Sequence, residues 1–409
     1  MRWLRWLGRR VTARDGDFWS DYHGTDSWSG ERVTVQGAMN LSAFWACARI
    51  TAQTIATLPI TVYERKSNGD RVPAPDHPLY RLLRDTPNAD QTAVEFWEGR
   101  VLGLCTTGNG FAEKVSSGRT LIALNAMPAD TAVDEQQDGS LRYRFVDRGK
   151  EVTLPEEKVF HVRAFGDGRS GMSPVAYARQ TLGIAMATDK AAGQLFSKGM
   201  RAKGFFTFPS QLTSEQREQA RKNFAERYSG SDAPGVGILE AGVAFQPVNI
   251  SPHDAELILS RKFNVEEICR WLGVPPIVIG HSAEGQTMWG SGVEHIMQSW
   301  LTLGLRPYLK RIEQAISKRL LTPEEQRRFF AEFNVEGLLR ADSAGRMKFY
   351  QGAIQNAIMT PNQARAKENM EQMEGGDQLL VNSTLIPLAL AGQQRPSNQG
   401  SGTRAADDE

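Results

Sequence analysis

The stretch from Ser173 to Gly199, SPVAYARQTLGIAMATDKAAGQLFSKG, decides the architecture of this chain because it encodes a long helix with a clear start and end. Ser173 is a favoured N-cap residue and Pro174 is favoured at the first helical position, whereas Gly199 stands where a left-handed C-terminal residue is needed. About 25 residues lie between these signals, and at about 1.5 Å per residue they give a helix of roughly 37 Å. The sequence therefore predicts one long helix here.

One face of this helix carries small side chains. Gly183 and Gly193 stand nearby, and each costs about 1 kcal/mol relative to alanine within a helix unless packing requires it. A face of small residues lets a second helix approach closely. The residues that recur on it at heptad spacing are Ala178, Ala185 and Ala192.

A second long helix is predicted from Ser251-Pro252 to Gly273, where two prolines follow at positions 275 and 276. Between the two helices, residues 204–250 form a separate module. We expect it to contain a strand at 204–208, a charged helix over 213–228 and two strands around 240–242. The two long helices therefore leave and return from one small α/β cap.

A third helix begins at the capping box Ser291-x-x-Glu294 and runs to about Leu321. Gly304 and Pro307 interrupt it, and a kink is expected there. The segment before it, IVIGHSAEGQTMWG over 277–290, is polar, rich in glycine and longer than a helix connection needs. Loops of this kind usually carry a function.

The N-terminal part has a mixed pattern. Helical spacing over 38–57 is followed by a strand at 60–63 and an Asn68-Gly69 turn. A further helix is predicted over 92–106, with short strands at 110–115, 121–127, 141–146 and 158–165. After the third helix, short helices are expected over 342–357 and 361–371, whereas residues 391–409 are poor in hydrophobic residues and predicted to be disordered. The fold class is therefore α+β.

Composition sets limits on function. The chain has 409 residues, 40% hydrophobic and 23% charged, which is enough for two or three compact units. Its 48 basic and 47 acidic residues nearly cancel, so any contact with nucleic acid must come from local patches. Cys47, Cys105 and Cys269 form no C-x-x-C pair and lie among apolar neighbours, which indicates buried reduced thiols and a reducing compartment.

Membrane attachment has weak support. No run of eighteen apolar residues occurs, so a transmembrane helix is not expected. The N-terminal segment Met1–Arg10, MRWLRWLGRR, alternates Arg with Trp and Leu. It is either a basic arm that docks on a partner or an amphipathic segment at a membrane surface.

The residues offer few catalytic motifs. Gly166-Asp-Gly168-Arg-Ser-Gly171 matches G-x-G-x-x-G, but no βαβ unit surrounds it and the helix begins only at Ser173. A glycine-rich turn into a capped helix is the competing interpretation. No P-loop occurs, and the six histidines are scattered without zinc-ligand spacing; even His295, beside Glu294, fits a solvated helix position better than a ligand. We therefore expect no enzyme, no metal and no cofactor.

Basic residues gather near the end of the first long helix: Lys190, Lys198, Arg201 and Lys203. They either complement the helix dipole from a solvated helix end or contact phosphates along a duplex. Phosphate contact needs no reading of bases.

From about Ala38 to Asp377 the chain closely resembles the portal proteins of tailed bacteriophages, in particular the shorter class common in siphophages. The resemblance rests on the order and spacing of short motifs, and the family usually has Glu where Gln363 stands. The motifs are Ser42 to Tyr63 with Leu58-Pro59, Asp76-His77-Pro78-Leu79, Leu82-Leu83 through Pro87-Asn88, Gly108-Asn109-Gly110, Gly171-x-Ser173-Pro174, Leu239-Glu240-x-Gly242, Ile268 through Gly273-Val274-Pro275-Pro276, Leu305-Arg306-Pro307, Asn362-Gln363-Ala364-Arg365 and Gly375-Gly376-Asp377.

This resemblance implies the portal fold, with an α/β wing, two long stem helices, a small α/β clip, a kinked channel helix and a helical crown. Mapped onto this chain, the parts are 1–170 for the N-terminal arm and wing, 171–203 for the first stem helix, 204–250 for the clip, 251–273 for the second stem helix, 274–292 for the tunnel loop, 293–340 for the channel helix and wing completion, 341–390 for the crown and 391–409 for the tail.

The resemblance also implies a function. Such proteins form a ring, typically dodecameric, at the unique vertex of the capsid, through which double-stranded DNA passes during packaging and ejection. The implied partners are DNA without sequence specificity, the terminase large subunit, the major capsid protein, a head-completion adaptor, and a scaffold or maturation protease. The implied location is the virion, with assembly in the host cytoplasm.

Site residues follow from the same mapping. The tunnel loop would present His281, Gln286, Thr287 and Trp289 to DNA. Lys198, Arg201 and Lys203 would meet phosphates near the stem and clip, and Ala178, Ala185 and Ala192 would pack stems of adjacent subunits together. Two other classes compete: a nucleotide-binding enzyme that uses the 166–171 motif, and a capsid or adaptor subunit, which would have no need for two helices around a small module.

Overall fold

The structure is a computed structural model that describes residues 27–118, 120–194, 204–207, 213–219, 244–247, 252–281, 291–335, 343–368 and 370–380. Helices and strands are both present, so the predicted α+β class is confirmed. The chain divides into two compact units, Met1–Asn334 and Val335–Glu409. Met1–Arg10 and the tail over 391–409 lie outside the described residues.

The first long helix is present in two pieces, α6 (Pro174–Tyr177) and α7 (Arg179–Gln194). Its predicted start is confirmed, because the Ser173 hydroxyl accepts a hydrogen bond from the Ala176 amide at 3.2 Å. The prediction of one continuous helix is wrong at Ala178, where ψ is 9° and the helix is interrupted. The predicted end at Gly199 lies outside the described residues.

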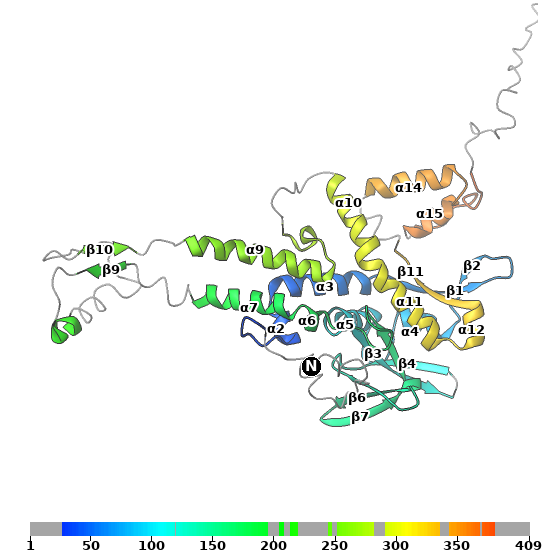
Figure 1. Ribbon diagram of the computed structural model, residues 1–409. Coiled ribbons are helices and arrows are strands. Elements are labelled where there is room, and N and C mark those ends of the chain that lie inside the picture. Colours follow the sequence, from blue (N-terminus) through cyan, green and yellow to red (C-terminus); the bar gives the residue numbers. More distant parts are fainter. Residues whose placement is uncertain are drawn as a thin grey trace, which may run out of the picture. The chain divides into compact units, whose positions relative to one another are not determined.

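The second long helix is α9 (Pro252–Leu272), and it lies beside α7 (Figure 1). Of the module between these helices, the structure describes the antiparallel strands β9 (Gly204–Thr207) and β10 (Ala244–Pro247) and a helical stretch over 214–219. The predicted strand at 204–208 is therefore confirmed, whereas residues 240–242 lie outside the described part.

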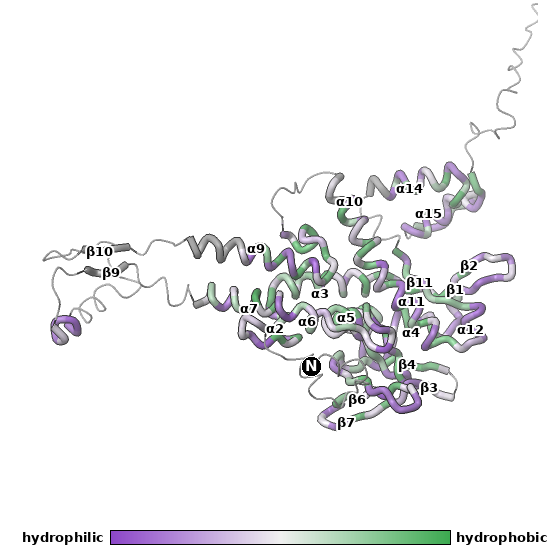
Figure 2. The backbone as a smooth tube through the Cα atoms, in the orientation of Figure 1, coloured by the Kyte–Doolittle hydropathy of each residue, from purple (hydrophilic) through white to green (hydrophobic). Residues whose placement is uncertain are grey.

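The core of the first unit centres on two helices that pack against each other, α3 (Ser42–Ala56) and α5 (Ala93–Thr106). Thr92 and Glu95 form a capping box that starts α5. Figure 2 shows hydrophobic residues along α3, whereas the tip of the hairpin after β1 (Ile60–Arg65) is hydrophilic. The largest buried side chains of the two helices are Phe44, Ile55, Phe96, Trp97 and Leu104.

All described strand pairs are antiparallel. One sheet has the order β4-β3-β8, and a second has the order β5-β6-β7. Their bounds are Asn109–Ser117 (β3), Thr120–Ala126 (β4), Ala132–Glu135 (β5), Leu141–Asp147 (β6), Lys150–Pro155 (β7) and Val159–Arg163 (β8). The strands predicted at 110–115, 121–127, 141–146 and 158–165 are confirmed, and β5 and β7 were not predicted.

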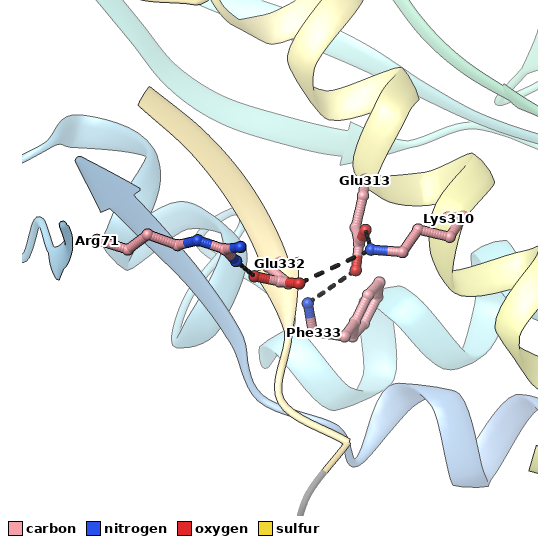
Figure 3. Close-up of polar contacts among 5 residues, drawn as sticks. All are labelled: Arg71, Lys310, Glu313, Glu332 and Phe333. Carbon is pink, nitrogen blue, oxygen red and sulfur yellow. Dashed lines mark hydrogen bonds and ion pairs between the residues drawn. The ribbon is translucent and has the colours of Figure 1, made fainter. Parts of the chain in front are cut away.

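A third sheet joins distant parts of the chain in the order β11-β1-β2. Strand β11 (Phe329–Phe333) pairs with β1 so that Phe333 lies opposite Ile60, and β2 is Arg71–Pro73. The outer edge of β11 faces α11 (Arg306–Leu320), where Glu313 accepts a hydrogen bond from the Phe333 amide at 3.0 Å (Figure 3). Lys310 pairs with Glu313 at 2.6 Å, so the carboxylate has a charged partner as well.

The third helix contains the expected interruption. Helix α10 (Ser291–Ser299) continues into a π-helical segment, η5 (Trp300–Leu305), and then into α11, where Pro307 stands in the first turn. A side chain at Gly304 would meet the ring of Trp300 and the carbonyl of Gly273. Gly304 therefore allows the close approach that accompanies the irregular turn.

The second unit contains α14 (Ser343–Gln355) and α15 (Pro361–Lys367), which confirms the two helices predicted there. Their contact is a small cluster of Tyr350, Ala353, Met359 and Ala364. The remaining described elements are α2 (Val35–Met39), α4 (Pro78–Arg84), η2 (Glu156–Lys158), η4 (Pro276–Ile279) and α12 (Pro323–Arg328). No helix among the described residues combines the length and apolar composition needed to cross a membrane.

Candidate functional site

The paired helices α7 and α9 are the first part of the candidate site. Leu182, Ala185 and Ala192 on α7 and Ile268 on α9 are buried. Two polar contacts join the helices at their surface: Trp271 Nε1 donates to Thr181 Oγ1 at 3.1 Å, and Arg261 Nε lies 3.1 Å from Asp189 Oδ1. The ion pair is half exposed and contributes little, so apolar burial holds the pair together.

A segment before α2 covers another side of α7. The Trp28 amide donates to the Gln180 side chain at 2.9 Å, and Lys190 pairs with Glu31 at 2.8 Å. A side chain at Gly183 would overlap Ser27, which explains why glycine is tolerated inside this helix. Lys190 therefore has a carboxylate partner within the subunit, which neither of the two sequence interpretations included.

The three alanines are buried within this one chain. Ala178 follows α6 at the helix break, and Ala185 and Ala192 lie on α7. Packing inside the subunit thus accounts for the small-residue face. Their role between the stems of adjacent subunits stays a prediction.

The exposed side of the helix pair carries a different apolar feature. A groove of about 470 Å³ runs between α7 and α9, and its two large apolar side chains, Ile184 and Phe263, are 48% and 58% exposed. The groove is lined by Thr181, Ile184, Ser260, Phe263, Asn264 and Glu267. These two side chains are open to solvent in the single subunit, so they are available to a partner. Sequence spacing does not predict this groove, because its residues come from two helices that are distant in the chain, although Phe263 belongs to the apolar face of α9.

The loop after α9 begins with ordered structure. Pro276–Ile279 form the 3-10 helix η4, which packs on α3, and Gly280 ends it with φ of 79°. His281 Nε2 then lies 3.8 Å from Glu266 Oε1 on α9. The other residues predicted to face DNA, Gln286, Thr287 and Trp289, lie outside the described residues, as do Lys198, Arg201 and Lys203.

The G-x-G-x-x-G motif has a packing explanation. Asn109 Oδ1 accepts from the Gly171 amide at 2.7 Å, and Asn109 Nδ2 donates to the Gly171 carbonyl at 3.1 Å. A side chain at Gly171 would overlap the carbonyl of Gly108, and one at Gly166 would overlap the carbonyl of Ser170. Backbone segments therefore occupy the space beside these glycines, which favours the structural interpretation over a nucleotide site.

A buried histidine ties this region to the second sheet. His161 Nε2 lies 2.9 Å from Asn109 Oδ1, which is an acceptor, so Nε2 carries the proton. Nδ1 then accepts from the Tyr143 hydroxyl at 3.1 Å and from Arg163 Nε at 3.3 Å. Burial, followed by the charges of Arg163 and Arg319, holds the pKa of His161 well below its ordinary value of 6.5. The histidine is a neutral structural link between strands.

Chemistry-bearing side chains are sparse in the rest of the described chain. Among the residues described, no group of three His, Cys, Asp or Glu side chains is placed to hold a metal ion. The described part of the site consists of the exposed surface of α7 and α9 and the first residues of the loop that follows α9. Such an arrangement suits assembly and contact with a large partner.

Comparison with known proteins covers most of the chain. The family model described as "Phage portal protein" matches residues 42–369. The chain is 33% identical over 404 residues to the portal protein of Enterobacteria phage HK97, covering 96% of this chain and 94% of that protein. It is 30% identical over 380 residues to the probable portal protein of Streptomyces phage phiC31, covering 88% and 81%.

Solved structures share the fold. The neck of an empty gene transfer agent (GTA) particle, computed with C6 symmetry, gives a TM-score of 0.62 at 21% identity and covers 83% of this chain and 92% of the matched chain. An HK97-family phage portal protein from Corynebacterium diphtheriae gives a TM-score of 0.52 at 18% identity, with coverage of 76% and 99%.

Proposed function

The chain belongs to the phage portal protein family, as its motifs predicted, and we propose that its copies close into a ring at one vertex of a phage capsid, through which double-stranded DNA is packaged and ejected. The observation that carries this proposal is the match to HK97 portal protein along almost the whole of both chains. The predicted portal fold is confirmed by the likeness to the Corynebacterium diphtheriae portal structure.

The parts of the subunit can be assigned from the helix pair α7 and α9. In this proposal, α7 and α9 form the stem, and residues 204–250 form the clip beyond it. The segment from α10 through α11 is the channel helix, and the unit that holds α14 and α15 is the crown. The three sheets β4-β3-β8, β5-β6-β7 and β11-β1-β2 make up most of the wing.

We place the subunit contact at the exposed groove between α7 and α9. A closed ring needs each subunit to offer two different surfaces to its neighbours, and the GTA neck structures that share this fold were solved with C12 and C6 symmetry. Ile184 and Phe263 supply apolar area for such a contact. The buried alanines Ala178, Ala185 and Ala192 support it from inside by setting how closely the two stem helices lie.

DNA contact in this proposal is weak and independent of sequence. Gln286, Thr287 and Trp289 of the tunnel loop touch the duplex as it moves. His281, whose Nε2 lies 3.8 Å from Glu266 Oε1, meets the duplex at the start of the loop. Lys198, Arg201 and Lys203 meet phosphates near the stem and clip. A formal net charge of +1 suits a channel that must let DNA slide, because many fixed cations would hold the phosphates.

Other proteins supply the chemistry. We propose that this protein catalyses no reaction itself and that the terminase large subunit docks on the clip to drive DNA. The major capsid protein and a head-completion adaptor contact other parts of the ring, with a scaffold or maturation protease present during assembly in the host cytoplasm. The basic segment Met1–Arg10 fits an arm that docks on one of these partners.

Negative-stain electron microscopy with a mass measurement on the purified chain tests the proposal. Closed rings with a central channel are expected, and the mass fixes the subunit number. A chain that stays monomeric at high concentration would overturn the ring, and closed shells would point to a capsid subunit. Calorimetry with NAD and with ATP tests the enzyme alternative, for which binding heat would be required.

A further inference from the structure

Two of the three cysteines meet inside the protein. Cys47 on α3 and Cys269 on α9 are both buried, and their sulfur atoms lie 3.6 Å apart. The residues are 222 positions apart in the sequence, so neither the cysteine count nor the spacing indicated a pair. The third cysteine, Cys105, is buried on α5, which packs on α3, and shares a hydrogen bond with Tyr308.

We propose that Cys47 and Cys269 are a latent disulfide site, which stays reduced while the chain is in a reducing compartment and joins α3 to α9 when the protein meets a peroxide. A disulfide has an S–S length of about 2.0 Å, so the two sulfurs, now 3.6 Å apart, must approach by about 1.6 Å. Helix α3 packs on α5 in the core, and α9 pairs with α7. The bond would therefore fasten the second long helix to the core of the first unit.

The two thiols differ in which one reacts first. The hydrogen bond from Cys47 lowers the pKa of Cys269, although burial opposes this, so Cys269 is the thiol that ionises first. The same hydrogen bond, together with burial, raises the pKa of Cys47, which keeps its proton. The thiolate is the reactive form of cysteine, so Cys269 is the initial nucleophile.

The chemistry balances with one hydrogen peroxide molecule. The Cys269 thiolate attacks one peroxide oxygen, an S–O bond forms, the O–O bond breaks, and the departing hydroxide takes up a proton to become water. Cys47 then loses its proton and attacks the Cys269 sulfur, so that an S–S bond forms, the S–O bond breaks and a second water leaves. Two electrons pass from the sulfurs to the peroxide.

Burial sets the rate of this reaction. Cys47 and Cys269 have 0% and 1% of their surface exposed, so peroxide reaches them only when the end of α9 opens from α3. We therefore expect slow oxidation that speeds up in mild denaturant. This site does not depend on the ring, whereas its use rests on the proposed function: a particle that leaves the reducing cytoplasm would gain a covalent tie between stem and wing.

The test counts thiols in the full-length chain. The reduced protein, freed of reductant, is treated in mild denaturant with one equivalent of hydrogen peroxide until the peroxide is consumed, and is then fully unfolded in the presence of a thiol reagent. We expect the count to fall from three to one, with the loss of two hydrogen atoms in the intact mass and a cross-linked pair of peptides containing Cys47 and Cys269. Dithiothreitol should restore all three thiols.

Cys105→Ala is the matched control, because it removes a buried thiol that is not part of the pair. It should still form the bond, whereas Cys47→Ala and Cys269→Ala should not. A wild-type chain that keeps three thiols, or one whose peptide map joins a different pair or two chains, would overturn the site. These results come from the wild-type chain, so they hold even if a variant misfolds, and ring formation is scored separately by electron microscopy.

Discussion

Glu313 shows how much one side chain can matter in this fold. It stands on α11 with only 10% of its side chain exposed, and its carboxylate covers the amide of Phe333 at the outer edge of β11 (Figure 3). An uncovered strand edge is a site for unwanted pairing. Lys310 supports the carboxylate and also lies 3.8 Å from Glu332, which Arg71 holds at 3.2 Å.

Replacing Glu313 with alanine should therefore destabilise the subunit. The change leaves the Phe333 amide buried without its acceptor, which costs about 1–3 kcal/mol. Glu313→Gln, which keeps an acceptor, should lose less. Urea unfolding followed by circular dichroism measures the effect, and Gln314→Ala, at the exposed neighbouring position, should stay within about 0.5 kcal/mol of the wild type. Equal losses for Glu313→Ala and Gln314→Ala would contradict this role.

The lowered pKa of His161 makes the free energy of unfolding depend on pH. Its pKa in the folded chain is well below 6.5, mainly because of burial, so the unfolded chain binds a proton between that pKa and about 6.5 and the folded chain does not. The contribution of His161 to stability is therefore constant above about pH 6.5 and falls as the pH drops, by up to about 1.4 kcal/mol per pH unit. His77, whose pKa burial also lowers, adds to the same slope.

The measurement is the urea midpoint between about pH 7.5 and pH 5, the window that lies above the ordinary carboxylate pKa values. His161→Gln should flatten the dependence even if its stability at neutral pH is lower. His295→Gln, at an exposed position, should keep the wild-type slope. If His161→Gln also keeps that slope, another group is responsible.

Gly171 and Gly193 should respond in opposite directions to alanine. A side chain at Gly171 overlaps the Gly108 carbonyl, so Gly171→Ala should cost about 1–3 kcal/mol or prevent folding. Nothing lies within 4 Å of a side chain at Gly193 on α7, so Gly193→Ala should stabilise the helix by about 1 kcal/mol. Thermal unfolding measures both changes in stability, and an unchanged midpoint for Gly171→Ala would contradict the packing role of Gly171.

At the scale of elements, capping residues in the sequence predicted where helices start. They did not predict helix breaks that depend on contacts with other elements. Ser173 and Pro174 mark a helix start, and that start is observed. The break at Ala178 has no proline or glycine to announce it, because it arises where the chain turns from contact with α5 to contact with α9. Likewise, Gly304 and Pro307 predicted an interruption, but a π-helical segment rather than a simple kink accommodates it.

Local sequence signals do not predict the pairing of β11 with β1, because more than 250 residues separate the strands and no hairpin signal joins them. The same limit applies to the site. The small-residue face was visible in the sequence, but only the structure shows that those alanines are buried inside the subunit. Only the structure shows that Ile184 and Phe263 are exposed in a groove between two helices that are far apart in the sequence. Burial depends on which neighbours arrive, and spacing within one helix does not specify them.

At the scale of the whole molecule, we expect substitutions in the groove between α7 and α9 to weaken ring assembly without lowering the stability of the subunit. Ile184→Ser combined with Phe263→Ser should change the urea midpoint little, because both side chains are about half exposed. The same double variant should shift the population from rings to monomers, since it removes apolar area at the proposed contact. Mass photometry measures the distribution.

Ile122→Ser is a fitting control, because Ile122 is 52% exposed on β4, outside the groove. It should leave rings intact. If wild-type chains form no rings, the proposed function fails; if the double variant forms rings as readily as the wild type, only the location of the contact fails. The two outcomes are therefore distinguishable.

The tunnel loop gives the last prediction, and the structure defines where to cut. Pro276–Ile279 are packed on α3, and Gly280 ends that turn, so a replacement that starts at residue 282 leaves the packed turn and His281 in place. Exchanging 282–290 for a glycine-serine segment of equal length should preserve rings but lower the amount of DNA retained in packaged heads, because Gln286, Thr287 and Trp289 are lost. Retention is measured as nuclease-protected DNA per particle. The same exchange in the exposed turn 66–70 after β1 should retain DNA normally. Normal retention in the 282–290 variant would remove the loop from the DNA path, and loss of rings would assign it to assembly instead.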